Sequence, residues 1–128
     1  MTDTTTQAVS HPARLQIFEK NSRTLSSAQP ALMKAFWGLH KETVASGALD
    51  TKTKELIALA ISVAGRCDDC ISHHTYDALQ AGATREEIAD ALSVAILMGG
   101  GIGVVYATHA IEAVDQFIER AGEDVRRD

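Results

Sequence analysis

Apolar and polar residues recur along most of this chain with the spacing of an α-helix. The pattern predicts a short helix over residues 13–25 and a second over 30–46, with Pro30 in its first turn, where a missing N–H costs nothing. The apolar side of this second helix is expected to consist of Leu32, Ala35, Phe36, Leu39 and Thr43. Asp50 precedes a third helix, 51–65, which is apolar nearly all round and is therefore expected to be central and buried.

The second half of the chain continues the helical pattern. A helix is expected over 68–81, ending at Gly82, and Thr84 forms a capping box with Glu87 that opens the next helix. Glycines at 99–101 and 103 interrupt that helix, and a last helix is expected over 102–121. Its inward side is expected to carry Val104, Thr108, Ile111, Val114 and Ile118. No run alternates with a period of two between turn residues, so the sequence predicts an all-α fold without a sheet.

The composition is typical of one globular domain. The 128 residues are 45 % hydrophobic and 23 % charged, and the formal net charge is −5. This acidic balance argues against nucleic acid and against an anionic membrane surface as partners. Residues 1–12 are polar and rich in threonine, without the apolar stretch of a signal peptide. We therefore expect a flexible tail over 1–12, a single domain over 13–128 and a cytoplasmic location.

One stretch resembles a membrane helix by composition. Residues 91–111 contain no Asp, Glu, Lys or Arg, and Gly99 and Gly103 have the G-x-x-x-G spacing of packed membrane helices. The glycines, however, would divide the stretch into two short halves. We therefore expect a buried helix–turn–helix rather than a membrane span.

The strongest chemical signal is the segment from Cys67 to His74. In a helix, residues i, i+3 and i+7 share one face, so Cys67, Cys70 and His74 are expected to line up. One helical turn separates two Cα atoms by a distance that a disulfide tolerates. Cys67 lies at a helix N-terminus, which favours a thiolate, and His74 lies one turn from Cys70 and can accept its proton. Glu55 is expected to orient His74, if the helices that carry them pack together.

Zinc binding is the main alternative interpretation of these residues. Cys67, Cys70 and His74 offer three ligands, and Glu55 or His73 offers a fourth. Structural zinc sites usually pair two such knuckles, and this chain has a single Cys pair. The chain would then be a zinc-bound or redox-sensing assembly protein rather than an enzyme.

The other histidines are expected to have structural roles. His73 lies four residues from both Asp69 and Asp77, so a solvated ion pair away from the cysteine face is expected. His109 is expected to pair with Glu112 on a helix surface. We expect His40 at the surface and His11 in the N-terminal tail. Trp37 and Tyr106 are expected in the core or at an interface.

Residues 52–117 resemble the AhpD-like alkylhydroperoxidases of the carboxymuconolactone decarboxylase superfamily. The resemblance rests on the run Lys54 to Ala60, on C-x-x-C-x-x-x-His, on Gly82-Ala83 followed by Thr84 to Ile88, and on the glycine run with Tyr106 and Ala110 to Ala113. The family pattern of a glutamate, two cysteines and a histidine matches Glu55, Cys67, Cys70 and His74. Some family members carry a histidine between the cysteines, whereas this chain has Asp68 and Asp69 there.

The resemblance implies a bundle of about five to six helices that assembles as a trimer or hexamer. It also implies a thiol peroxidase that reduces alkyl hydroperoxides, in which Glu55 and His74 relay a proton and generate the thiolate of Cys70. Cys67 would resolve the sulfenic acid of Cys70 as a disulfide. No bound cofactor or metal is implied, and an external dithiol, such as a lipoyl group or a thioredoxin-like protein, would be the reductant. The decarboxylases of the superfamily lack the Cys pair, so a decarboxylase or lactone-processing activity is the second alternative.

Overall fold

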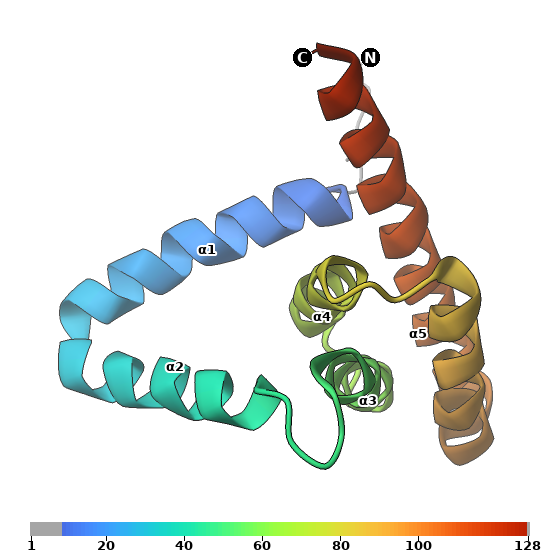
Figure 1. Cartoon of the computed structure of the whole chain (residues 1–128), viewed down its shortest axis with the longest axis horizontal. Coiled ribbons are helices and arrows are strands. Elements are labelled where there is room, and N and C mark those ends of the chain that lie inside the picture. The colour runs from blue at the N-terminus through green and yellow to red at the C-terminus, as the bar shows by residue number, and fades with distance from the viewer. Residues whose placement is uncertain (1–8, 128) are drawn as a thin grey trace, which may run out of the picture.

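Five helices make up the computed structural model, which describes residues 9–127 (Figure 1). The helices are α1 (His11–Ala28), α2 (Pro30–Val44), α3 (Thr51–Ala64), α4 (Asp68–Gln80) and α5 (Arg85–Arg127). Helices α3 and α4 lie at the centre, with α5 along one side and α1 and α2 forming an angled arm along the other. The prediction of an all-α fold without a sheet is confirmed for the described residues, and the bounds of α2, α3 and α4 agree with the sequence pattern to within two residues.

Helix α5 is divided by its glycines, as the sequence predicts. Gly100 has a φ of 61° and a ψ of −140°, a conformation in which only glycine avoids a steric clash. The chain reverses direction there, and the two halves of α5 lie side by side (Figure 1). At their crossing a Cβ on Gly103 would lie 2.8 Å from the carbonyl oxygen of Ala95, so this close approach requires glycine.

The core lies where α3, α4 and α5 meet. Leu59, Val63, Ile71, Ile88 and Val114 are fully buried there. The inward side of the second half of α5 is a row of small residues, Gly103, Ala107, Ala110 and Ala113, followed by Phe117. Of the residues predicted to face inward, Val114 is confirmed as buried, whereas Val104, Thr108 and Ile118 are exposed and that part of the prediction is wrong. Closely packed helices need small side chains at the contact, and the large residues that are buried in this half, Val114 and Phe117, lie nearer its C-terminal end.

The N-terminal boundary also differs from the sequence expectation. His11 and Pro12 are buried and form the first turn of α1, where the Ser10 hydroxyl accepts a hydrogen bond from the N–H of Ala13 at 3.3 Å. The expected flexible tail over 1–12 is therefore wrong for residues 11 and 12. The rest of that prediction falls largely on residues 1–8, which lie outside the described part of the chain.

Large apolar side chains remain exposed in the single chain. Helix α2 has no buried residue, and its expected apolar side, with Leu32, Phe36 and Leu39, points to solvent. Helix α3 is buried only on one side, because Ile61 is 65 % exposed. Helix α5 is long and apolar enough to cross a membrane by length and composition alone, and Leu97 and Met98 are 81 % and 79 % exposed. The expected complete burial of α3 and of the glycine-interrupted hairpin is therefore wrong for one isolated chain.

Candidate active site

A tight turn between α3 and α4 places the first cysteine at a helix N-terminus. The N–H of Gly65 donates to the carbonyl of Ile61 at 2.7 Å, and the N–H of Cys67 donates to that of Ser62 at 3.1 Å. Arg66 lies between them with a φ of 55°, in the left-handed region that favours glycine. Because three residues reverse the chain, α4 packs directly against α3.

Cys67 and Cys70 are joined by a disulfide across the first turn of α4. Their Cα atoms are 5.2 Å apart, which agrees with the sequence expectation that one helical turn accommodates the bridge. Cys67 is the N-cap residue, and its Sγ accepts a hydrogen bond from the N–H of Cys70 at 3.2 Å. The positive end of the helix therefore faces Cys67 Sγ, which favours the thiolate when the bridge is open.

Glu55 and His74 form a hydrogen-bonded pair between α3 and α4. The Oε2 atom of Glu55 lies 2.8 Å from Nδ1 of His74, and Glu55 is 2 % exposed. An ionised carboxylate accepts the Nδ1–H hydrogen, and this tautomer leaves Nε2 of His74 free to take up a proton. His74 follows Cys70 by one helical turn, so the pair lies on the same face of α4 as the disulfide. The structure thus joins the four residues that the sequence singled out into two pairs, the Cys67–Cys70 disulfide and the Glu55–His74 hydrogen bond, with three of the four residues at the start or within α4.

A stack of imidazole rings continues from His74 toward α2. The ring centroids of His73 and His74 are 4.9 Å apart, and those of His73 and His40 are 5.6 Å apart with nearly parallel planes. Nε2 of His73 lies 3.0 Å from Oδ2 of Asp77, and this hydrogen bond raises the pKa of His73. The predicted ion pair of His73 is confirmed with Asp77 as its partner, although the pair lies against α2 rather than in open solvent.

His40 is not the simple surface residue that the sequence suggested. Its ring lies against His73 and 5.5 Å from the ring of Trp37, and its Nε2 atom is buried without a hydrogen-bond partner among the described residues. The signal that could have placed it is a second stripe on α2, at a helical spacing of four, three and four residues. Its members, Met33, Trp37, His40 and Val44, are all partly buried.

Two further histidines lie on the other side of α4. His109 bonds to Asp68, with Nδ1 2.7 Å from Oδ1, so the expected pairing with Glu112 is wrong. His11 is buried and its Nδ1 is hydrogen-bonded to the hydroxyl of Ser72. Burial is the main reason why the pKa of His11 is lowered. Both contacts join residues more than 40 positions apart, so they cannot be predicted from the local spacing of residues in the sequence.

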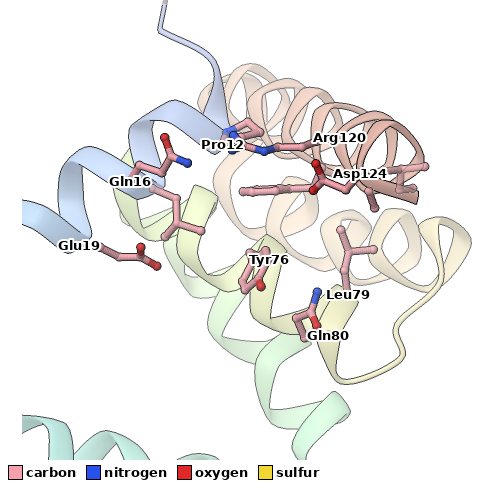
Figure 2. A pocket seen from close by; sticks show the side chains of 12 residues that line it. Pro12, Gln16, Glu19, Tyr76, Leu79, Gln80, Arg120 and Asp124 are labelled. Carbon is pink, nitrogen blue, oxygen red and sulfur yellow. The ribbon is translucent and has the colours of Figure 1, made fainter. Parts of the chain in front are cut away.

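Two hollows flank the arm formed by α1 and α2. One, of about 480 Å³, lies between α1, α4 and α5 and is lined by Tyr76, Phe117, Arg120 and their neighbours (Figure 2). The other, of about 270 Å³, is lined by Phe18, Trp37 and His73 among others. None of the four predicted site residues lines either hollow, but the second is lined by His73, whose ring stacks on that of His74.

In the disulfide-bonded state the cysteines are not free to bind the zinc ion that the C-x-x-C spacing offers as an alternative. Both sulfur atoms are engaged in the disulfide. Among residues 9–127, the groups of side chains close enough to share a metal ion are His40, His73 and Asp77, and Glu55, His74 and Asp77, and neither group contains a cysteine.

Comparisons with known proteins identify the family. The model of the "Carboxymuconolactone decarboxylase family" matches residues 30–113, which include all four site residues. An uncharacterized protein of Cupriavidus necator is 44 % identical over 80 % of this chain and 90 % of its own length. The crystal structure of a carboxymuconolactone decarboxylase family protein from Legionella pneumophila superposes with a TM-score of 0.81 at 37 % identity, over 84 % of this chain and 96 % of that one.

A more distant relative carries a named activity. It is the alkyl hydroperoxide reductase AhpD of Mycolicibacterium paratuberculosis, 27 % identical over 58 % of this chain and 42 % of its own length. The family match spans well over half of the chain, and it includes the helical core as well as the disulfide and the Glu–His pair. The chain therefore belongs to the carboxymuconolactone decarboxylase family.

Proposed function

We propose that this protein is a thiol-dependent peroxidase that reduces alkyl hydroperoxides. The observation that carries the proposal is one helix face on which a Cys67–Cys70 bridge is followed by His74, itself bonded to the buried Glu55. Spacing alone supports either redox chemistry or metal binding. A disulfide beside a proton-transfer pair supports redox chemistry, and the likeness to an alkyl hydroperoxide reductase supports a peroxide as substrate.

The reaction begins with the reduced protein. His74 takes the proton of Cys70 at Nε2, while Glu55 stabilises the imidazolium through Nδ1. The Cys70 thiolate attacks the terminal oxygen of ROOH, the O–O bond breaks, and the alkoxide takes the proton from His74 and leaves as ROH. The sulfur is thereby oxidised to a sulfenic acid, Cys70–SOH. The Cys67 thiol then attacks this sulfur and releases water, which forms the disulfide present in the structure.

A dithiol closes the cycle. One of its thiolates attacks Cys67 and forms a mixed disulfide, and its second thiol releases Cys67 as the donor itself becomes a disulfide. The donor loses two electrons and two protons, which restore the two cysteine thiols. A lipoyl group or a thioredoxin-like protein supplies such a pair, and the protein needs no resident cofactor for this chemistry.

The assignment of Cys70 as the attacking residue is open to direct test. The helix N-terminus favours the thiolate of Cys67, whereas His74 favours that of Cys70, and we follow His74 because it can also protonate the leaving alkoxide. A dimedone-type reagent added with peroxide should label Cys70 in Cys67→Ser, with mass spectrometry as the readout. Label found only on Cys67 in the Cys70→Ser variant would reverse the order of the two cysteines.

Peroxide consumption tests the function as a whole. The reduced protein with dihydrolipoamide should consume an alkyl hydroperoxide catalytically, and the Cys67→Ser/Cys70→Ser double variant should not. A double variant that keeps full activity on a lactone or a carboxymuconolactone, while the wild type leaves peroxides untouched, would favour the decarboxylase alternative.

We further propose that several copies of the chain assemble, as a trimer or hexamer. The exposed apolar side chains on three helices support this, since a small chain has difficulty burying several apolar helices alone. They are Leu32, Phe36 and Leu39 on α2, Ile57 and Ile61 on α3, and Val94, Leu97 and Met98 on α5. A lipid bilayer is a poorer match, because the non-helical backbone at Gly100 would leave peptide groups unpaired in hydrocarbon.

Light scattering on the purified protein tests the assembly. Leu97→Glu should shift the mass toward the monomer, whereas Val125→Glu, equally exposed but near the C-terminal end of α5, should leave it unchanged. A wild type that is monomeric at micromolar concentration, or that binds neutral lipid vesicles, would refute the proposal.

A further inference from the structure

We infer that His40, His73 and Asp77 form a binding site for a divalent transition-metal ion beside the Cys–His face of α4. One donor atom from each residue lies within 4.8 Å of the others. The three residues come from two helices, so a shared ion would join α2 to α4. This site contains neither cysteine, and it differs from the zinc site that the C-x-x-C spacing suggests.

The geometry of the cluster is close to that of a bound metal. Ligand atoms about 2.0–2.2 Å from a tetrahedral ion lie about 3.3–3.6 Å from one another. Nε2 of His73 and Oδ2 of Asp77 are already 3.0 Å apart. The donor atom of His40 lies within 4.8 Å of the other two, so it has to move by at most about 1.5 Å. Helix α2 has no buried residue, so a shift of this size does not disturb the core.

The Nε2 atom of His40 is a second, independent observation. It is buried and has no hydrogen-bond partner among the described residues, although imidazole nitrogens inside proteins are normally satisfied. A metal ion shared with His73 and Asp77 would supply the missing partner. In the neighbouring group of Glu55, His74 and Asp77, no side-chain atom is both buried and without a hydrogen-bond partner.

The donor set selects the class of ion. Two imidazoles and one carboxylate suit zinc and other first-row divalent ions, whereas magnesium and calcium prefer oxygen ligands. Three protein ligands leave at least one coordination position open. His73 also lines the hollow of about 270 Å³ between α1 and α2, so this hollow borders the proposed site.

Zinc binding by the oxidised, untagged protein tests the site. In the oxidised form the cysteines are held in the disulfide and cannot act as ligands, and absence of free thiol is checked before each titration. Competition with a chromophoric chelator should give one zinc ion per chain, and cobalt should give the visible absorption of a four- or five-coordinate ion. His40→Ala and His73→Ala should each weaken zinc binding by at least about tenfold.

His109→Ala is the matched control. His109 is a half-buried histidine paired with an aspartate, like His73, but it lies on the other side of α4. This variant should bind zinc as the wild type does. Circular dichroism establishes that each variant is folded, and amide hydrogen exchange in α2 should slow when zinc is added to the wild type. The site is refuted by binding well below one ion per chain, by an unchanged affinity in His40→Ala, or by a Glu55→Gln variant that loses as much affinity as His40→Ala.

Discussion

Replacing Glu55 by glutamine separates the charge of the proposed relay from its shape. The glutamine side chain has nearly the same volume and still accepts a hydrogen bond from Nδ1 of His74. It carries no charge, so it cannot stabilise the imidazolium that forms when His74 takes the proton of Cys70. Glu55 is 2 % exposed, and solvent therefore screens this charge only weakly.

The size of the effect follows from the bond that is weakened. A hydrogen bond to a charged group contributes about 1.5–3 kcal/mol, and one between neutral groups contributes about 0.5–1.5 kcal/mol. Losing about 1–2 kcal/mol in the transition state lowers the rate by about 5–30-fold. His74→Ala removes the general base and acid altogether, and the expected loss is about 100-fold or more.

Stopped-flow consumption of an alkyl hydroperoxide by the pre-reduced protein isolates the step concerned. A single turnover avoids the dithiol donor, so the measured rate reports the attack on peroxide and no later exchange. Glu42→Gln, an exposed carboxylate on α2, serves as the matched control and should react at the wild-type rate. Equal rates for the wild type, Glu55→Gln and His74→Ala would refute the relay. A rate loss seen only in the steps that need the dithiol donor would mean that Glu55 and His74 act in disulfide reduction and not in the attack on peroxide.

Three further predictions concern the stability of the fold. Burial lowers the pKa of His11 below the ordinary value of a histidine, so the unfolded chain takes up a proton first as the pH falls. The free energy of unfolding should therefore decrease from pH 7.5 to 5.5, and urea denaturation should show a smaller decrease in His11→Gln. Arg66→Gly removes the steric strain of a side chain in the left-handed backbone region, so it should raise the free energy of unfolding by up to about 1 kcal/mol. A melting temperature below that of the wild type would contradict this. Gly103→Ala places a Cβ 2.8 Å from the carbonyl oxygen of Ala95 and should cost about 1–3 kcal/mol, whereas Gly99→Ala meets no atom within 4 Å and should be neutral or stabilising by thermal melting.

The helix boundaries that are set by local chemistry follow from the sequence. Asp50 accepts a hydrogen bond from the N–H of Thr53 at 2.8 Å and begins α3. Thr84 and Glu87 form the reciprocal bonds of a capping box before α5, at 3.0 and 3.1 Å. Gly100 divides α5 where the glycine cluster predicted a break. In each case the responsible residue lies within three positions of the backbone group that it affects, so sequence spacing is sufficient.

The candidate site is predictable only in part for the same reason. Cys67, Cys70 and His74 belong to one helix, and their common face follows from the helical repeat. Glu55 is 19 positions from His74, and their hydrogen bond depends on how α3 packs against α4. Only resemblance to a family could supply that pairing from the sequence. His40 comes from a third helix without any such motif, and spacing could not bring it to the site.

Periodicity also fails where a helix has two apolar sides. On α2, Leu32, Phe36 and Leu39 form one stripe, and Met33, Trp37 and Val44 form another with His40. The first is the more hydrophobic, and the sequence therefore favours it as the buried side. In the structure the second stripe lies against the rest of the chain, because its aromatic rings pack on Phe18 and His73. This exposed apolar stripe is one of the observations that support the proposed assembly of several copies.

The two sides of α2 link the proposed assembly to the proposed chemistry. Its outer stripe would be covered by a second copy, and its inner stripe reaches His73 and, through it, His74. Within one chain α2 has no buried residue to hold it, so its position over the histidine stack depends on weak contacts. Burying the outer stripe against another copy would fix α2, and with it the ring of His40, against α4. Assembly would therefore complete the surroundings of His74 rather than merely bring several independent sites together.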